Sequence, residues 1–219
     1  MVIRKITIRN ITSFKGEQTI DFTAEPLRSA GLFAITGDTG AGKSTILDAV
    51  CLALYNRAPR FDDREQLKYI TGQSPDTDIE LRGSDTRNAL RRGETYGMCC
   101  VEFSTAEGVF RATWQLRIKR TGRYARPEQT LEQIAPNHRT INPQDFAGEV
   151  KRIVGLDYEQ FTRTVILAQN SFANFLRAHQ NDKSALLEKI TGTEIYALIS
   201  KEVYRLNQEA QKAYEVKCS

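Results

Sequence analysis

The spacing of hydrophobic positions changes several times along the first part of the chain. Residues 2–10 (VIRKITIRN) set isoleucines among charged and β-branched residues, and residues 18–22 (QTIDF) repeat this pattern over a shorter stretch. Both patterns predict strands. Residues 31–36 (GLFAIT) form a continuous apolar run bounded by glycines, which predicts a buried parallel strand. Over residues 43–56 the apolar positions recur at helical spacing, which predicts a helix with one buried face.

The middle of the chain predicts an antiparallel meander. Residues 56–95 are polar and rich in Arg, Asp, Gly and Thr, and we interpret them as a surface excursion with short elements. Residues 98–105 and 109–120 predict a β-hairpin that turns at Ala-Glu-Gly, and residues 129–136 predict a third strand beside it. Residues 144–155 have helical periodicity and end at a glycine.

Helical patterns dominate the rest of the chain. Residues 157–169 begin helical and end in an apolar run, and residues 181–192 predict a short capped helix that ends at a glycine. A long polar helix follows from Thr193. Its apolar positions are separated by alternate steps of four and three residues, which is the spacing of a coiled coil. Because this helix has no C-terminal cap, we interpret the chain as part of a longer one.

A complete phosphate-binding motif lies between the predicted strand 31–36 and the predicted helix. Residues 37–44 (GDTGAGKS) fit the pattern G-x-x-x-x-G-K-[ST]. The glycines allow backbone N–H groups to converge on phosphate oxygens, and the helix that follows adds the positive end of its dipole. The dinucleotide pattern G-x-G-x-x-G fails at Thr45, so a nucleoside triphosphate is favoured. The residues expected to contact it are Gly37, Asp38, Thr39, Gly40, Ala41, Gly42, Lys43, Ser44 and Thr45.

Three side chains of this motif have distinct expected roles. Lys43 is expected to reach the β- and γ-phosphates as a mobile charge. The Ser44 hydroxyl is expected to bind Mg²⁺, and Thr45 is expected to help hold the α-phosphate.

Composition narrows the remaining function classes. The net charge of +4 is too weak by itself to indicate nucleic-acid binding. Four cysteines without CxxC spacing and two histidines predict no zinc site. No apolar run approaches the roughly 20 residues of a membrane span, and the N-terminus lacks the apolar core of a signal peptide. We therefore predict a cytoplasmic protein without a membrane segment.

The motif alone leaves several nucleotide-binding classes open. A GTPase would carry an N/T-K-x-D motif to read guanine, and the chain has none. A small kinase would need a lid with catalytic arginines, for which residues 56–95 qualify by composition alone.

Longer segments carry a resemblance to a known family. They are ITIRNITSFKGEQTIDF before the phosphate motif, then LDYEQFTRTVILAQNSFANFLRA and LLEKITGTEIY far downstream. In these segments the chain resembles the SbcC family, the bacterial branch of the SMC-like double-strand-break-repair ATPases. The resemblance implies an α/β fold: the N-terminal lobe of an ABC-type P-loop ATPase head, with a mixed sheet and an antiparallel meander. It further implies a lobe over residues 1–192 and the start of a coiled coil over residues 193–219.

The resemblance also assigns a sensor and shows what the chain lacks. It places Gln169 at the family's Q-loop, where the glutamine completes the Mg²⁺ shell and senses the γ-phosphate. The family's hydrolysis also needs an Asp-Glu pair and a Ser-Gly-Gly loop, and neither sequence occurs in this chain. In the family both lie in a C-terminal lobe. We therefore expect the chain to bind ATP and Mg²⁺ weakly, and to be inactive alone as an ATPase.

A basic stretch suggests a contact with DNA. Residues 109–127 (VFRATWQLRIKRTGRYARP) contain six basic residues and no acidic one, with Trp114 and Tyr124 interleaved. Such a hairpin end either binds backbone phosphates without reading sequence or is merely a solvated edge. The residues expected to contact DNA are Lys119, Arg120 and Arg123.

The resemblance implies the following function. Joined to its own C-terminal lobe, the chain would form a homodimer around two ATP molecules and bind double-stranded DNA. It would also regulate the SbcD nuclease, in a nucleoid-associated complex. The alternatives are a non-nucleolytic SMC-type DNA clamp that organises chromosomes and, less favoured, a self-contained P-loop kinase.

Overall fold

The computed structural model describes residues 1–62, 68–71, 79–141, 144, 146–166 and 194–218. The chain divides into two units, Met1–Phe161 and Thr162–Ser219, and each is described by itself. None of the described helices is long and apolar enough to cross a lipid bilayer.

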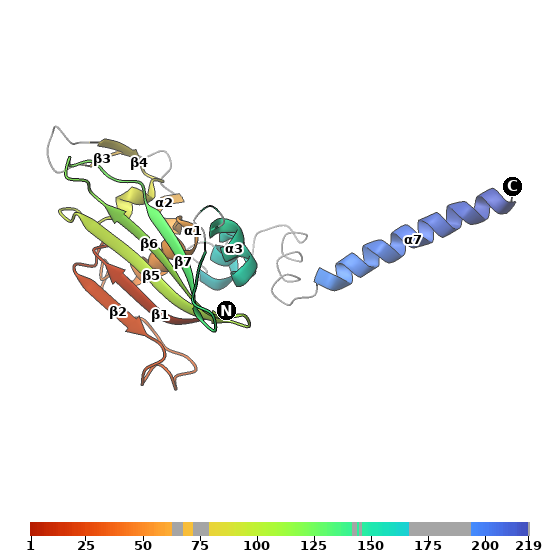
Figure 1. The fold of residues 1–219 in the computed structure, drawn as a ribbon, viewed down its shortest axis with the longest axis horizontal. Helices are drawn as coiled ribbons and strands as arrows, with labels where there is room; N and C mark the ends of the chain where they lie inside the picture. The colour runs from red at the N-terminus through yellow and green to blue at the C-terminus, as the bar shows by residue number, and fades with distance from the viewer. Residues whose placement is uncertain (63–67, 72–78, 142–143, 145, 167–193, 219) are drawn as a thin grey trace. The chain divides into compact units, whose positions relative to one another are not determined.

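A six-stranded sheet forms the body of the first unit (Figure 1). Its spatial order is β2–β1–β5–β6–β7–β8, and every neighbouring pair is antiparallel. The strands are β1 (Val2–Arg9), β2 (Glu17–Asp21), β5 (Tyr96–Thr105), β6 (Gly108–Arg117), β7 (Glu128–Ala135) and β8 (Arg139–Ile141). The excursion predicted at residues 56–95 contains a separate antiparallel pair, β3 (Lys68–Thr71) and β4 (Ile79–Arg82).

The predicted meander is confirmed, and period-two alternation explains it. Along β5 and β6 every second residue is buried, including the cross-strand pairs Cys99↔Trp114 and Val101↔Ala112. The intervening residues point to the other face, where Glu102 pairs with Arg111. A strand with this pattern keeps one face against the core and the other face in water. The third predicted strand is β7.

Helices cover the buried face of the sheet. They are α1 (Lys43–Tyr55), α2 (Pro59–Asp62), α3 (Phe146–Val154) and α4 (Tyr158–Phe161), with a short 3₁₀ turn at Thr86–Ala89. Helix α1 packs against β1, β5 and β6 on one side and against α2 and α3 on others. Residues 49–54 are therefore all buried, so the expected single buried face is wrong for the second half of this helix.

The prediction of a buried strand at residues 31–36 is wrong. The segment has no strand pairing in the described structure, and the exposed fractions of Leu32, Phe33 and Ile35 are 93%, 46% and 45%. Its apolar composition is typical of a central strand, but a strand also needs a hydrogen-bonding neighbour, and none of the described strands pairs with it. The Phe33 ring contacts the Phe22 ring in a tilted arrangement, at 5.4 Å between ring centroids.

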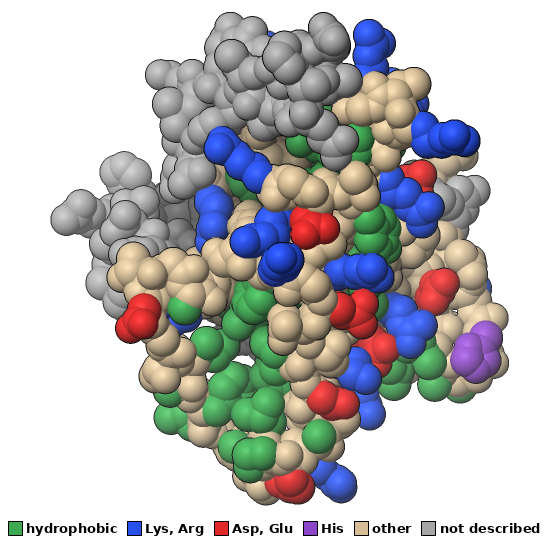
Figure 2. Space-filling model, turned by 90° about the vertical axis from the view of Figure 1, so that its left-hand side faces the viewer, with side chains coloured by type: hydrophobic (Ala, Val, Ile, Leu, Met, Phe, Trp, Pro, Cys, Tyr) green, Lys and Arg blue, Asp and Glu red, His purple; other side chains and the backbone are tan. Residues whose placement is uncertain are grey.

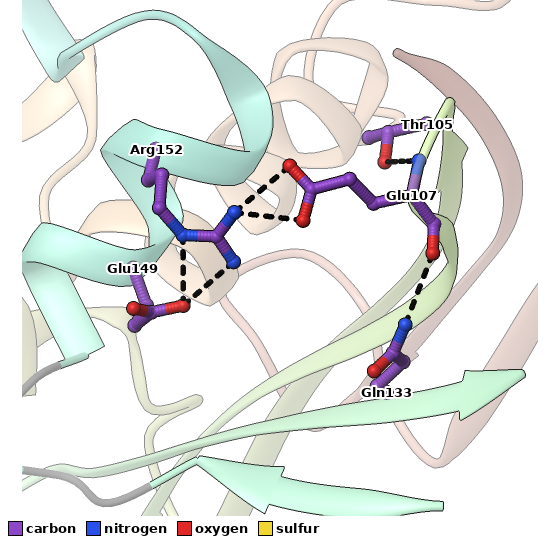
Figure 3. Close-up of polar contacts among 5 residues, drawn as sticks. All are labelled: Thr105, Glu107, Gln133, Glu149 and Arg152. Carbon is purple, nitrogen blue, oxygen red and sulfur yellow. Dashed lines mark hydrogen bonds and ion pairs between the residues drawn. The ribbon is translucent and has the colours of Figure 1, made fainter. Parts of the chain in front are cut away.

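Helix α3 confirms the helix predicted at residues 144–155. A cluster of charged side chains connects it to the turn between β5 and β6. Figure 3 shows Arg152 of α3 between Glu149, one turn earlier, and Glu107 in the turn. Both Nη1 contacts to Glu107 are shorter than 2.9 Å, and the Glu107 carbonyl accepts from Gln133 of β7. Phe146, Val150 and Ile153 of α3 are buried, and the helix packs against α1 and β7.

The second unit contains one long helix among its described residues. A π-helical turn spans Thr162–Ile166, and α7 spans Glu194–Cys218, where the sequence predicted a helix. Three of its predicted coiled-coil positions are strongly exposed: Ile199 (52%), Val203 (59%) and Leu206 (51%). The short helix predicted at residues 181–192 lies outside the described residues.

Candidate nucleotide site

The phosphate loop, residues 37–42, joins the exposed apolar run to α1. Its three glycines have φ angles of +152°, +88° and +100°, in the region that residues with a Cβ rarely adopt. A turn closed by the Ala41 N–H donating to the Asp38 carbonyl at 3.1 Å bends the loop toward the helix. The glycines therefore give the loop its curvature, as the motif requires.

The first turn of α1 is open to an anion. Gly42 is the N-cap residue and offers no side-chain bond to the helix, and the first turn holds no acidic residue. The first N–H groups of a helix lack partners within it and carry the positive end of its dipole. A helix start without a capping side chain, preceded by a glycine loop, fits a phosphate group.

Lys43 and Ser44 lie at the start of α1, directly after the loop. The Lys43 Nζ donates to the carbonyls of Gly37 and Asp38, at 2.6 Å and 2.8 Å, so the ammonium group lies across the loop. Ser44 is exposed at the start of the helix. A cation held by loop carbonyls and an exposed hydroxyl beside it form a donor set that suits a triphosphate and its Mg²⁺.

The side chain of Thr45 faces the interior of the protein. It is completely buried, its hydroxyl lies 2.8 Å from the Thr12 hydroxyl, and Arg60 donates to it at 3.3 Å. Arg60 also pairs with the carboxylate of Asp48, which is 4% exposed, at 2.8 Å. Thr45 therefore anchors the first turn of α1 in this structure, and its predicted contact with the α-phosphate stays a prediction.

Sequence reasoning missed the residues that support this turn. The position of Asp48 could have predicted an ion pair, since a carboxylate among the apolar positions of a buried helix needs a cationic partner. The sequence gives no indication of the roles of Thr12 and Arg60, because only the fold brings them to Thr45. Gln169, the predicted sensor of the γ-phosphate, lies outside the described residues.

The predicted DNA-contacting residues lie together in one turn at residues 118–124, here called the basic turn. An isolated bridge pairs Ile118 with Tyr124, and the Lys119 N–H donates to the Arg123 carbonyl at 2.8 Å. Lys119, Arg120 and Arg123 are all exposed. Among the described residues none of these three makes an ion pair, whereas Arg111 of the same stretch is paired with Glu102 and Glu132.

More basic side chains adjoin this turn. Arg9 and Arg117 both contact the ring of Tyr96, with guanidinium carbons 5.4 Å and 5.2 Å from its centroid. Figure 2 views the molecule from the side on which β1 ends and β5 begins, and basic side chains gather across the middle and upper part of that face. Hydrophobic side chains lie open toward its lower edge.

Comparison with known proteins places this fold and motif in a family. The AAA domain matches residues 5–217, nearly the whole chain. The chain belongs to the AAA domain family. Its fold is accordingly that of an AAA-type P-loop ATPase domain, built here on an antiparallel sheet.

Several curated proteins are similar to this chain over most of its length. The chain is 42% identical to the C subunit of the nuclease SbcCD of Pseudomonas aeruginosa over 97% of its own length, and 39% identical to the Rhodobacter capsulatus protein of that name over 96%. It is 32% identical over 84% to the "Probable DNA double-strand break repair Rad50 ATPase" of Aquifex aeolicus. The chain spans 18%, 17% and 16% of these relatives. The resemblance to SbcC is confirmed.

Proposed function

We propose that the chain is the ATP-binding lobe of an SbcC-like DNA-repair ATPase that belongs to a nuclease complex. The observation that carries the proposal is the phosphate loop in front of an uncapped helix, in a chain similar over nearly its whole length to proteins named as the C subunit of the nuclease SbcCD. The name of the Aquifex aeolicus relative supports double-strand-break repair over a non-nucleolytic chromosome clamp. A cytoplasmic, nucleoid-associated location belongs to the same proposal.

The roles at the nucleotide follow from the donor set. Residues 37–45 surround the phosphates, Lys43 turns from the loop carbonyls toward the γ-phosphate, and the Ser44 hydroxyl binds Mg²⁺ together with Gln169. Magnesium would neutralise charge on the β- and γ-phosphates. The chain supplies binding and positioning, and the groups that activate water come from elsewhere.

A second lobe is required for turnover. The chain has neither an Asp-Glu pair nor a Ser-Gly-Gly sequence, and the exposed apolar run at residues 31–36 has the composition of a strand that is covered in the complete protein. We propose that the chain's own C-terminal lobe covers this run, and that two heads then dimerise around two ATP molecules. Residues 1–192 would form the lobe, and residues 193–219 would begin a coiled coil near the site for an SbcD-type nuclease.

The basic turn is proposed to contact double-stranded DNA. Lys119, Arg120 and Arg123 are exposed and, among the described residues, unpaired with any carboxylate, so their charge is available to backbone phosphates. Such contacts fix position without reading sequence.

Nucleotide binding is tested first. Titration of a fluorescent ATP analogue with Mg²⁺ into the chain is expected to show binding that Lys43→Ala abolishes. Lys201→Ala, which removes an exposed lysine of α7, is expected to bind normally. ATP turnover by the chain alone that disappears with Lys43→Ala would overturn the two-lobe part of the proposal.

DNA binding is tested in the assembled protein with both lobes. Reversing Lys119, Arg120 and Arg123 to Glu is expected to weaken binding to a duplex and to flatten its dependence on salt, by about one unit of slope per lost phosphate contact. The single variant Arg120→Glu is compared with Arg139→Glu, which reverses an exposed arginine on edge strand β8. Unchanged affinity of the triple variant at low salt would exclude this turn as a DNA contact.

A further inference from the structure

The connection between β1 and β2, residues 10–16, packs against the phosphate loop from outside the motif. The Thr12 hydroxyl lies 2.8 Å from the Thr45 hydroxyl. The ring of Phe14 lies over Gly42, so close that a β-carbon built on Gly42 would be 2.9 Å from ring carbon Cε2. The last glycine of the loop and the first turn of α1 therefore both rest on this connection.

The connection needs support to hold its shape. Asn10 and Thr12 have φ angles of +52° and +42°. Residues with a Cβ rarely adopt such backbone angles, and each one costs about 1 kcal/mol or more of folding free energy. The Asn10 carboxamide offsets part of this cost by accepting from the Gly16 N–H at 2.7 Å and donating to the Tyr96 carbonyl at 3.1 Å. The carbonyls of Thr12 and Ser13, in the middle of the connection, accept hydrogen bonds from the side chain of another residue.

That residue is Arg91, almost fifty positions beyond the motif. Its Nη1 donates to the Thr12 carbonyl at 2.9 Å and to the Ser13 carbonyl at 3.0 Å. Its own backbone N–H donates to the Asn10 carbonyl at 2.9 Å. Hydrogen bonds from a charged donor are about twice as strong as neutral ones, so this one side chain clamps the turn.

We propose that Arg91 is a positioning residue for the nucleotide site. It holds the connection, and the connection holds Gly42 through Phe14 and the first turn of α1 through Thr12. The inference rests on the proposed nucleotide binding and extends it: the phosphate loop is completed by a contact that its own motif does not contain. Arg91 acts through these neighbours and does not itself touch the nucleotide.

A role in nucleotide positioning differs from a role in stability alone. If Arg91 only stabilised the fold, its removal would lower the melting temperature and leave the affinity of the folded protein unchanged. If it positions the loop, affinity falls even where every molecule is folded. The neighbouring residue Arg92 is exposed and gives a control with the same charge and almost the same place in the chain.

The experiment measures binding of a fluorescent ATP analogue with Mg²⁺ to the 219-residue chain, well below its melting temperature. Arg91→Ala is expected to weaken binding about three- to tenfold, the loss of part of a charge-assisted bond. Arg91→Lys is expected to recover part of this loss, and Arg92→Ala to match the parent chain. Amide hydrogen exchange across residues 12–16 is expected to speed up in Arg91→Ala and not in Arg92→Ala.

The outcomes separate this inference from the function on which it rests. If Lys43→Ala leaves binding unchanged, or if the parent chain binds no nucleotide, both proposals fail. If Lys43→Ala abolishes binding while Arg91→Ala matches Arg92→Ala, only the positioning role is wrong. Should Arg91→Ala unfold, Phe14→Ala tests the same path with both Arg91 bonds intact, and normal affinity in that variant would overturn the inference.

Discussion

Asn56 is the C-cap residue of α1, and its replacement tests quantitatively how the end of this helix is stabilised. It has φ +51°, and its N–H donates to the Leu52 carbonyl as a left-handed cap. Its side-chain oxygen accepts from the indole N–H of Trp114 at 2.6 Å and from the Thr86 hydroxyl at 3.1 Å. Asn56 therefore joins the end of the phosphate-loop helix to the centre of the sheet.

The expected cost of Asn56→Ala has two parts. Alanine in the left-handed region costs about 1 kcal/mol relative to asparagine or glycine. The Trp114 side chain is completely buried, so loss of its acceptor leaves an indole N–H without a partner, which costs about 1–3 kcal/mol. The sum is a loss of about 2–4 kcal/mol in the free energy of unfolding. Asn56→Gly removes the oxygen but tolerates the backbone angle, so it is expected to lose about 1 kcal/mol less than alanine.

The assay is urea unfolding followed by tryptophan fluorescence, since Trp114 is the only tryptophan in the chain. At about 2–3 kcal/mol per molar urea, the midpoint for Asn56→Ala should fall by about 1 M. Asn137→Ala, a change at an exposed position in the turn before β8, should leave it unchanged. Equal midpoints for Asn56→Ala and Asn56→Gly would refute the backbone part of the reasoning. A parent-like midpoint for both would refute the indole part.

Three further outcomes are expected. Glu149 accepts from Arg152, which holds the pKa of its carboxyl below the usual value, so this contact stabilises the fold above about pH 4.3 and is lost as the pH falls further. Arg139 adds to the same field, and Arg152→Ala should flatten the acid side of a plot of melting temperature against pH. Gly42→Ala should lower both nucleotide affinity and melting temperature, because its φ of +100° and the nearby Phe14 ring both oppose a methyl group; titration and calorimetry check this. The exposed apolar run at residues 31–36 is expected to drive self-association of the chain; Leu32→Ser, at a side chain that is 93% exposed, should reduce it in sedimentation at unchanged melting temperature.

Local patterns predicted the elements whose contacts repeat along the chain. The alternation in β5 and β6 and the helical spacing of α3 each reflect burial on one side of a regular element, so the sequence contains the whole signal. The phosphate loop was predictable for a similar reason. Its glycines and Lys43 act within one short segment, and the motif reflects what that segment needs.

Two failures have a common physical cause. The run at residues 31–36 has the pattern of a buried strand, yet an apolar composition does not identify the segment with which such a strand would pair. The support of Thr45 by Thr12 and Arg60 is also a long-range contact, and single polar residues in loops leave no periodic signal. In both cases the missing information concerns a partner far away in the sequence.

The two ends of the phosphate loop are held very differently, and this bears on nucleotide affinity. The helix end rests on Phe14 and Thr12, which Arg91 clamps in turn. The strand end, residues 31–36, makes no backbone hydrogen bond to any described residue. A site that must order part of its backbone on binding loses affinity to that entropy, and pre-organising the segment restores it without a new contact to the ligand. Covering residues 31–36 with the proposed C-terminal lobe should therefore tighten nucleotide binding. The same covering should shrink the effect of Arg91→Ala, because a loop held at both ends depends less on either one.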